Sequence, residues 1–178
     1  MKVKNLYLIL IVCLWIISCE MPSNNDEVII SEFEVIVTGD VATMFSGVAN
    51  YATYTDPAIN EEAGILTLLR RDGLRGVTFT GKYKNFPNVR EFDIVEYNGD
   101  ISIKDIEEGE FFAMYVHTLD IEYSEIFNSM EGYLSIDTVR VEYVTGTFDF
   151  TAAEENNPNG REVNISGWFK ATEGEIRQ

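Results

Sequence analysis

The sequence predicts an all-β domain over residues 32–178, built as a single antiparallel β-sandwich or a partly closed β-barrel of about nine strands. In segment after segment, apolar and polar residues alternate with a period of two, which is the pattern of a half-buried strand. Turn-forming Gly, Pro, Asn and Asp separate these segments at short intervals, and no long helical pattern lies between them. Aromatic residues make up 12% of the chain, too many for a disordered acidic polypeptide.

Residues 1–18 have the layout of a signal peptide. Lys2 and Lys4 precede an unbroken apolar run from Leu6 to Ile17, and Ser18 supplies a small residue at the expected cleavage point. The run is shorter than the roughly 20 residues that a membrane-spanning helix needs. We therefore expect export and cleavage rather than a spanning segment.

The end of this run, Ile16 to Cys19, resembles the lipobox of bacterial lipoproteins. The resemblance implies cleavage before Cys19 and attachment of acyl chains, such as palmitate, to that residue. Two or three chains hold a protein on a membrane permanently, whereas one chain binds only marginally. Glu20 is not the Asp that favours inner-membrane retention in some bacteria, so an outer-membrane location is implied, on the periplasmic face or the cell surface. An ordinary signal peptide with an incidental Cys, or an uncleaved anchor, is the alternative.

The segment 19–31 would then be the lipidated Cys followed by a flexible polar tether, with a reach of about 20 Å. The formal net charge of the chain is −17. Such a chain repels nucleic-acid phosphates and anionic membrane surfaces, and nucleic acid is excluded as a partner. Cys13 leaves with the signal and Cys19 carries lipid, so the folded domain would have no disulfide and no Cys-based metal site.

The first strands follow from a period-two alternation of apolar residues at Phe33, Val35, Val37, Val41, Phe45, Ala49 and Tyr51. Thr38-Gly39-Asp40 is either a turn between two strands or a bulge within one long strand. A loop from Asp56-Pro57 leads to a hairpin of residues 64–70 and 77–83, for which Asp72-Gly73 supplies the turn. Further strands are expected at 91–97, 101–103 and 111–119, separated by turns at 86–88, 98–100 and 107–109.

Tyr123, Ile126, Phe127 and Met130 follow a helical spacing, which predicts a short helix or loop at 123–130. Strands follow at 133–136, 139–151 and 162–171, the last two joined by a turn at 157–160. Within 139–151 the apolar face switches from odd to even positions after Tyr143. Because one extra residue flips every following side chain, this switch predicts a β-bulge between Tyr143 and Gly146.

The last hairpin carries G-x-F-x-F-x-A from Gly146 to Ala152 and V-x-I-x-G-x-F from Val163 to Phe169. Together with the lipobox and Phe86-Pro87, these motifs resemble a family of uncharacterised Gram-negative lipoproteins, although Arg90 stands where that family has Gly. The resemblance covers about half of the chain. It implies an anchored β domain and no particular activity, because most of the motif residues are those that pack strands.

Catalytic groups are sparse. His117 is the only His, lies in an apolar strand and has no G-x-S-x-G elbow to meet it, so we interpret it as a strand residue whose ring is hydrogen-bonded or solvated. The densest acidic cluster comprises Asp105, Glu107, Glu108 and Glu110. It lacks the order of a known calcium loop, and we interpret it as a solvated turn. No enzyme activity, cofactor or metal is predicted.

Basic residues gather in one part of the sequence, at Arg70, Arg71, Arg75, Lys82, Lys84 and Arg90. On the predicted hairpin they could form one basic patch for an anionic glycan, a phosphate-bearing lipid or an acidic partner. Ion pairs with neighbouring acidic strands are the alternative. Trp168 is predicted to face outward with Asn164 and Ser166, where it could stack on a sugar ring or be covered by another segment.

Asp137-Thr138-Val139 resembles an O-glycosylation acceptor used in one group of Gram-negative bacteria, with Thr138 as the modified residue. Taken together, these features predict a non-enzymatic binding or accessory module, anchored in the outer membrane through Cys19, with a glycan or a protein as partner. The alternatives are an envelope polysaccharide hydrolase that uses Asp and Glu, and a structural subunit of a surface assembly.

Overall fold

A computed structural model describes residues 30–56, 60–98, 103–119, 124–155, 157 and 160–174. The predicted signal peptide, Cys19 and the tether as far as residue 29 lie outside the described residues. Within those ranges, no helix has the length and apolar character needed to cross a membrane.

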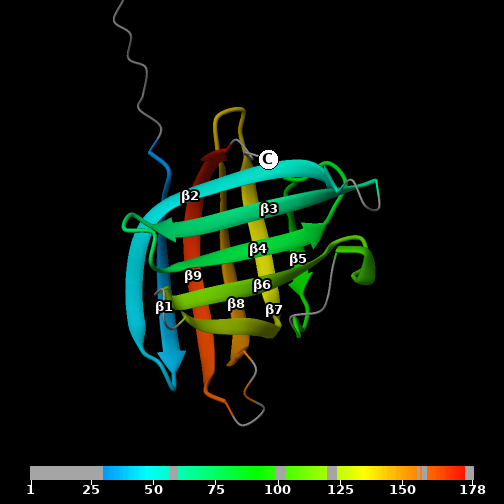
Figure 1. Ribbon diagram of the computed structural model, residues 1–178. Coiled ribbons are helices and arrows are strands. Elements are labelled where there is room, and N and C mark those ends of the chain that lie inside the picture. The colour runs from blue at the N-terminus through cyan, green and yellow to red at the C-terminus, as the bar shows by residue number, and fades with distance from the viewer. Residues whose placement is uncertain are drawn as a thin grey trace, which may run out of the picture.

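The described chain consists of nine strands and one short 3₁₀ helix, η1 (Ile103–Asp105). The strands are β1 (Glu32–Gly39), β2 (Thr43–Asp56), β3 (Glu61–Arg70), β4 (Gly76–Lys82), β5 (Arg90–Ile94), β6 (Glu110–Leu119), β7 (Ser124–Val139), β8 (Val144–Glu154) and β9 (Glu162–Glu173). Figure 1 shows them wrapped around one core.

The nine strands form a single sheet that closes into a barrel (Figure 1). The order around the ring is β1, β2, β3, β4, β6, β5, β7, β8 and β9, and β1 closes it by pairing antiparallel with β9 from Glu32–Lys170 to Gly39–Val163. The short β5 lies between β6 and β7, which also pair directly with each other beyond it. The predicted all-β fold is therefore confirmed, in the form of a closed sheet.

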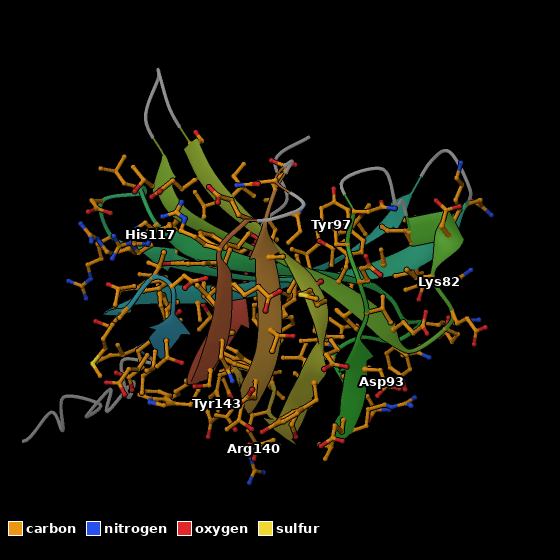
Figure 2. The ribbon with its side chains drawn as sticks, turned by 90° about the horizontal axis from the view of Figure 1, so that it is seen from below. Lys82, Asp93, Tyr97, His117, Arg140 and Tyr143 are labelled. Carbon is orange, nitrogen blue, oxygen red and sulfur yellow. The ribbon has the colours of Figure 1, made fainter. Side chains whose placement is uncertain are left out.

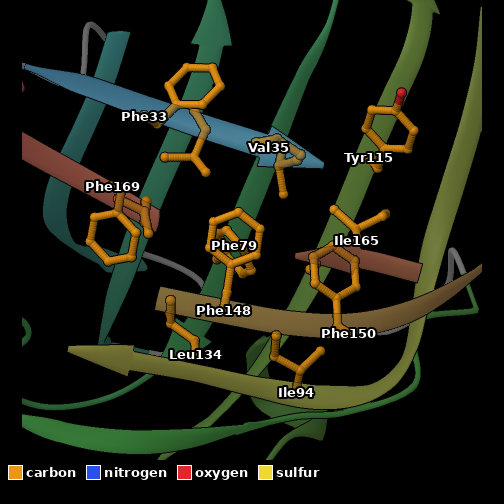
Figure 3. Close-up of a cluster of buried hydrophobic side chains, with 14 of the residues drawn as sticks. Phe33, Val35, Phe79, Ile94, Tyr115, Leu134, Phe148, Phe150, Ile165 and Phe169 are labelled. Atoms are coloured by element: carbon orange, nitrogen blue, oxygen red, sulfur yellow. The ribbon is translucent and has the colours of Figure 1, made fainter. Parts of the chain in front are cut away.

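Aromatic side chains fill the interior of the barrel (Figure 3). The Phe79 ring centroid lies 5.2 Å from that of Phe148 and 5.7 Å from that of Phe150. Val35, Leu134 and Ile165 are also fully buried at 0% exposure. Each such side chain contributes about 1.5–3 kcal/mol of transfer free energy on burial, so this core stabilises a domain that has no cysteine in its described residues.

Inward-facing glycines make room for these rings. A Cβ atom at Gly81 in β4 would lie 2.3 Å from the ring of Phe111, its paired residue in β6. In the last hairpin the relation is reciprocal: the Phe169 ring lies over Gly146, and the Phe148 ring lies over Gly167. The G-x-F spacing of both motif halves is thus a packing arrangement, in which each ring occupies the space that a neighbouring side chain would need.

The predicted short helix at 123–130 is wrong, because residues 124–130 are the first part of β7. A helical spacing appears there because β7 contains a bulge, seen as a register shift against β8 between Ser129 and Glu131. Phe127, Asn128 and Ser129 are consequently buried in succession, while Met130 is exposed. Tyr123 lies outside the described residues.

The bulge predicted between Tyr143 and Gly146 is also wrong. Residues 140–143 form the turn between β7 and β8, in which the Arg140 amide donates a hydrogen bond of 2.8 Å to the Tyr143 carbonyl. The apolar face switches at this point because one strand ends and the next begins. The second bulge in this hairpin lies in β7, between Ile136 and Thr138.

Smaller differences concern strand ends. Residues 38–40 lie at a turn between β1 and β2, β5 ends at Ile94, and Ile103 lies in η1 rather than in a strand. The predicted hairpin at 64–83 is confirmed, and Gly73 adopts φ +75° in its turn. Residues 99–101 of the predicted turn and strand, and residues 158–159 of the last turn, lie outside the described residues.

We predict that Gly81→Ala lowers the free energy of unfolding by about 2 kcal/mol, because the added methyl group overpacks the Phe111 ring. Urea denaturation of the single and double variants measures this. Gly81→Ala combined with Phe111→Leu should lose less than the sum of the two single losses, since the smaller side chain vacates the space. Additive losses would contradict the proposed packing.

Candidate functional site

A groove lies on the outer surface where β1 begins, beside Gly47. This residue of β2 pairs with Phe33 of β1 on one side and with Arg70 of β3 on the other. Because Gly47 has no side chain, the backbones of β2 and β3 approach closely there: a Cβ atom at Gly47 would lie 2.2 Å from the Leu69 carbonyl oxygen. Ser31 fixes the start of β1 beside Gly47 by accepting a 2.8 Å hydrogen bond from the Ala49 amide of β2.

The groove has a volume of about 620 Å³ and is lined on two sides by polar and apolar residues. One wall continues an outward-facing row of paired residues, Ser46 in β2, Glu34 in β1 and Trp168 in β9. The other is the turn between β3 and β4, which contributes Arg70, Arg71 and Asp72. Closure of the barrel through the β1–β9 pairing is what brings Trp168 to the same hollow as two of the predicted arginines.

The side chains in this groove differ in how strongly they are held. Arg70 donates hydrogen bonds to Asp72 through Nε, at 2.7 Å, and through Nη2. Those bonds hold the pKa of the Asp72 carboxyl below its usual range. Arg71, Glu32 and Glu34, by contrast, have no hydrogen-bond or ion-pair partner for their side chains in the part of the chain that the structure describes, so they are available to a ligand.

Trp168 faces outward, as predicted, with an exposed fraction of 42%. Its indole provides an apolar platform, Arg71 provides hydrogen-bond donors, and Glu32 and Glu34 provide acceptors. An aromatic face surrounded by unpaired donors and acceptors suits a carbohydrate, whose C–H face packs on the ring while its hydroxyl groups bind the polar side chains. Since acidic and basic groups share the groove, the arrangement favours a hydroxyl-rich ligand over a purely anionic one.

The predicted single basic patch is not formed. Lys82 and Lys84 line a different hollow together with Glu62 and Glu108. Figure 2 shows Lys82 on the opposite side of the molecule from His117. Only Arg70 and Arg71, at the β3–β4 turn, line the groove with Trp168. The length of β4 (Gly76–Lys82) separates that turn from Lys82 and Lys84 at the other end of the strand.

The two other arginines of this segment are engaged elsewhere. The Arg90 guanidinium lies over the rings of Tyr83 and Phe92, at 5.3 and 5.2 Å from their centroids. The Arg75 Nε atom donates a 2.9 Å hydrogen bond to the His117 carbonyl, and its Nη1 atom donates one of 2.8 Å to Thr43. Both arginines therefore hold strands and turns together.

His117 belongs to a polar network at one end of the barrel. Its Nδ1 atom lies 2.7 Å from the Tyr115 hydroxyl, and its Nε2 atom lies 3.7 Å from a carboxylate oxygen of Glu125. Arg161 donates to Glu125 at 2.6 Å and to Glu154 at 2.9 Å. The ring of His117 is hydrogen-bonded, which agrees with its interpretation as a structural residue.

Burial determines the titration of this network. Burial lowers the pKa of His117, assisted by the positive charge of Arg75, while Glu125 acts in the opposite direction. Burial also raises the pKa of Tyr115 to about 12. Tyr115 is 0% exposed and packs between Phe45 and Phe127, so its hydroxyl is neutral and has no access to a substrate. The network connects β6, β7 and β8.

Two side chains of the predicted acidic cluster accept hydrogen bonds from backbone amides. Glu110 accepts a 2.7 Å hydrogen bond from the Glu107 amide, and Glu108 accepts one of 2.9 Å from the Lys84 amide. No group of three or more His, Cys, Asp or Glu residues suited to a metal ion is found in the described residues. Thr138 pairs with Thr145 beside the β7–β8 turn, and its O-glycosylation stays a prediction.

Sequence reasoning identified Arg70, Arg71 and Trp168 but missed Glu32, Glu34 and the hollow at Gly47. The sequence alone does not show that β1 lies near the β3–β4 turn. The two come together because β1 and β3 pair with opposite sides of β2. Comparisons with protein-family models, curated proteins and solved structures found no match to the chain. The resemblance to Gram-negative lipoproteins therefore stays a prediction.

We predict that the stability of the protein falls as pH decreases through 6.5, the ordinary pKa of His. The pKa of His117 is lowered in the folded state, so the unfolded chain binds the proton first and acid favours unfolding. Thermal unfolding at about pH 7.5 and about pH 5.5 measures this above the main range of carboxylate titration. The control is His117→Gln, which should lose less stability over the same interval, because no other His is present. Equal losses in the two proteins would contradict the assignment.

Proposed function

We propose that the protein is a non-enzymatic, lipid-anchored module of the outer membrane that binds carbohydrate in the groove at Gly47. The observation that carries this proposal is the meeting of an exposed Trp168 with unpaired Arg71, Glu32 and Glu34 in one hollow. We call this the Trp168 groove.

The topology favours recognition through side chains. Each of the nine described strands pairs with a neighbour on both sides, although β5 pairs with β6 only at Asp93 and Ile94, so little sheet edge is left for a partner strand to extend. The interior is filled with rings, and the ligand would therefore bind on the outer surface. There the Trp168 groove offers both an apolar platform and unpaired polar groups.

Binding without hydrolysis fits the environment of Asp72, one of the three carboxylates that line the groove. Glycosidases use a pair of carboxyl groups, of which one stays protonated as the general acid. In the Trp168 groove, Asp72 is held by Arg70 and its pKa is lowered, the opposite of what that acid requires. His117 is not among the residues that line the groove.

The proposed anchor rests on the sequence at residues 1–19, and the start of the domain places the groove next to it. Ile30 and Ser31 both line the Trp168 groove. A tether of the length between Cys19 and Ile30 has an r.m.s. reach of about 20 Å. The groove would thus be held close to the membrane surface, where glycans of the envelope are concentrated.

We expect Trp168→Ala to weaken carbohydrate binding about fivefold or more, since loss of an aromatic stacking contact costs roughly 1 kcal/mol or more. A screen of envelope oligosaccharides on an array would identify the ligand. Isothermal titration calorimetry would then measure the affinity of each variant, including Trp168→Ala, which lacks the only Trp besides Trp15 of the predicted signal. Arg71→Ala should also weaken binding.

The matched control is Lys84→Ala, which removes an exposed cation outside the groove and should leave affinity unchanged. The melting temperature of Trp168→Ala should stay close to that of the unmodified protein, because the side chain is exposed. A large fall would make Trp168 a core residue. Hydrolysis of the bound glycan, abolished by Glu34→Gln, would replace the binding role with an enzymatic one.

Cys19→Ala should release the protein from the membrane fraction, because the acyl chains would be lost. Cell fractionation measures this, and protease treatment of intact cells establishes which face carries the domain. Digestion from outside would place it on the cell surface, and protection would place it in the periplasm. Unchanged fractionation of the Cys19→Ala variant would contradict lipid anchoring.

A further inference from the structure

The turn between β7 and β8 exposes an apolar side chain at its tip. Val141 is 92% exposed and neighbouring Val139 is 39% exposed. The turn is nevertheless well formed, since the Arg140 amide donates to the Tyr143 carbonyl at 2.8 Å. An ordered turn that holds Val141 in water is a candidate contact surface. We call residues 139–143 the β7–β8 tip.

Cations and an aromatic ring surround this tip. The Lys170 Nζ atom of β9 lies 4.5 Å from the centroid of the Tyr143 ring, and Arg140 is exposed. Glu142 is the one acidic residue within the tip. Tyr side chains are typical of the membrane–water interface, and Lys and Arg reach lipid phosphates while their stems cover apolar surface. The tip therefore combines the side chains that suit a lipid headgroup layer.

The position of the tip matches the point where the chain enters the barrel. Glu32 of β1 pairs with Lys170 of β9, and Lys170 pairs with Thr145 of β8. The start of β1 is thus two strands, or about 10 Å, from the strand that follows the tip. Figure 1 shows the β7–β8 turn projecting from the end of the barrel at which β1 begins. Ile30, two residues before the start of β1, is 57% exposed.

The length of the preceding chain determines what can reach this end. If Cys19 is lipidated, its tether keeps the start of β1 within about 20 Å of the headgroups. The whole chain is strongly acidic, with a net charge of −17, so most of its surface is repelled by anionic lipid. At this end Arg140 and Lys170 can each pair with a lipid phosphate, whereas Glu32, Glu142 and Glu173 lie at the same end and oppose that attraction. Docking there would depend on the apolar and aromatic side chains of the tip and not on net charge.

We propose that the β7–β8 tip docks on the phospholipid surface that carries the Cys19 lipid, with Val141 inserted between headgroups. Arg140 and Lys170 then lie at the level of the phosphates, and Tyr143 lies at the interface. This inference rests on the proposed anchor but not on carbohydrate binding. Docking fixes the orientation of the barrel, so the Trp168 groove opens alongside the membrane instead of rotating freely on the tether.

The experiment uses the full lipidated chain with a single environment-sensitive fluorophore at Val141→Cys. The described domain contains no cysteine, so the introduced thiol is the one that reacts. The control is Ala42→Cys in the exposed β1–β2 turn, which Figure 1 shows at the other end of β1. Both proteins are reconstituted into vesicles of phosphatidylethanolamine and phosphatidylglycerol, with and without a brominated lipid.

The label at position 141 should shift to the blue on the vesicles and be quenched by the brominated lipid, whereas the label at position 42 should do neither. A label at Val139→Cys should respond less than the one at 141, because Val139 is less exposed. Equal, water-like emission at 141 and 42 on membrane-bound protein would overturn docking while leaving the anchor intact.

Two further outcomes would also overturn the proposal. Protein that does not associate with the vesicles refutes the anchor and the docking together. A label at 141 that is protected in cells, but solvent-exposed on protein-free vesicles, would show that the tip binds another protein instead of lipid. Carbohydrate titration through Trp168 is read separately, so failure of the groove and failure of the tip are distinguishable.

Discussion

The packing of phenylalanine rings over inward-facing glycines is the constraint on which the barrel depends. At Gly146 and Gly167 a Cβ atom would lie 2.0 Å from the Ser135 carbonyl oxygen and 2.1 Å from the Glu34 carbonyl oxygen. The strands can therefore approach closely only because these positions lack side chains. The rings of Phe169 and Phe148 then fill the space inside, and the same two residues that permit curvature also define the core.

The closed sheet in turn creates the Trp168 groove. Trp168 and Arg71 come from segments far apart in the chain, and they meet because β9 pairs with β1, β1 with β2, and β2 with β3. Gly47 lines the groove between them. The network of Tyr115, His117 and Glu125 connects β6 with β7. In the groove, by contrast, the side chains of Arg71, Glu32 and Glu34 have no hydrogen-bond or ion-pair partner among the described residues.

Alternation was sufficient to identify most strands, because a half-buried strand shows its inner face directly in the sequence. It failed where β7 is bulged at Ser129, since the bulge imitates a helical spacing, and at Tyr143, where a strand end imitates a bulge. Trp168 was correctly placed on the outer face from its neighbours. Its groove was not predictable, because Glu34 and Gly47 become neighbours of Arg70 only through long-range strand pairing. The predicted basic patch failed for a different reason: the length of β4 places Arg75 and Lys84 at opposite ends of that strand.

The positions of the two ends of the barrel strands have a consequence for engineering. β1 begins beside the end of β9, since Glu32 pairs with Lys170, whereas the β1–β2 turn lies at the other end of β1. A circular permutant could join residue 174 to residue 30 and be opened in that turn, because exposed turns tolerate new termini. All strand pairings would be kept. A lipid attached at the new terminus, however, would place the β1–β2 turn at the membrane and the start of β1 at the far end of the barrel.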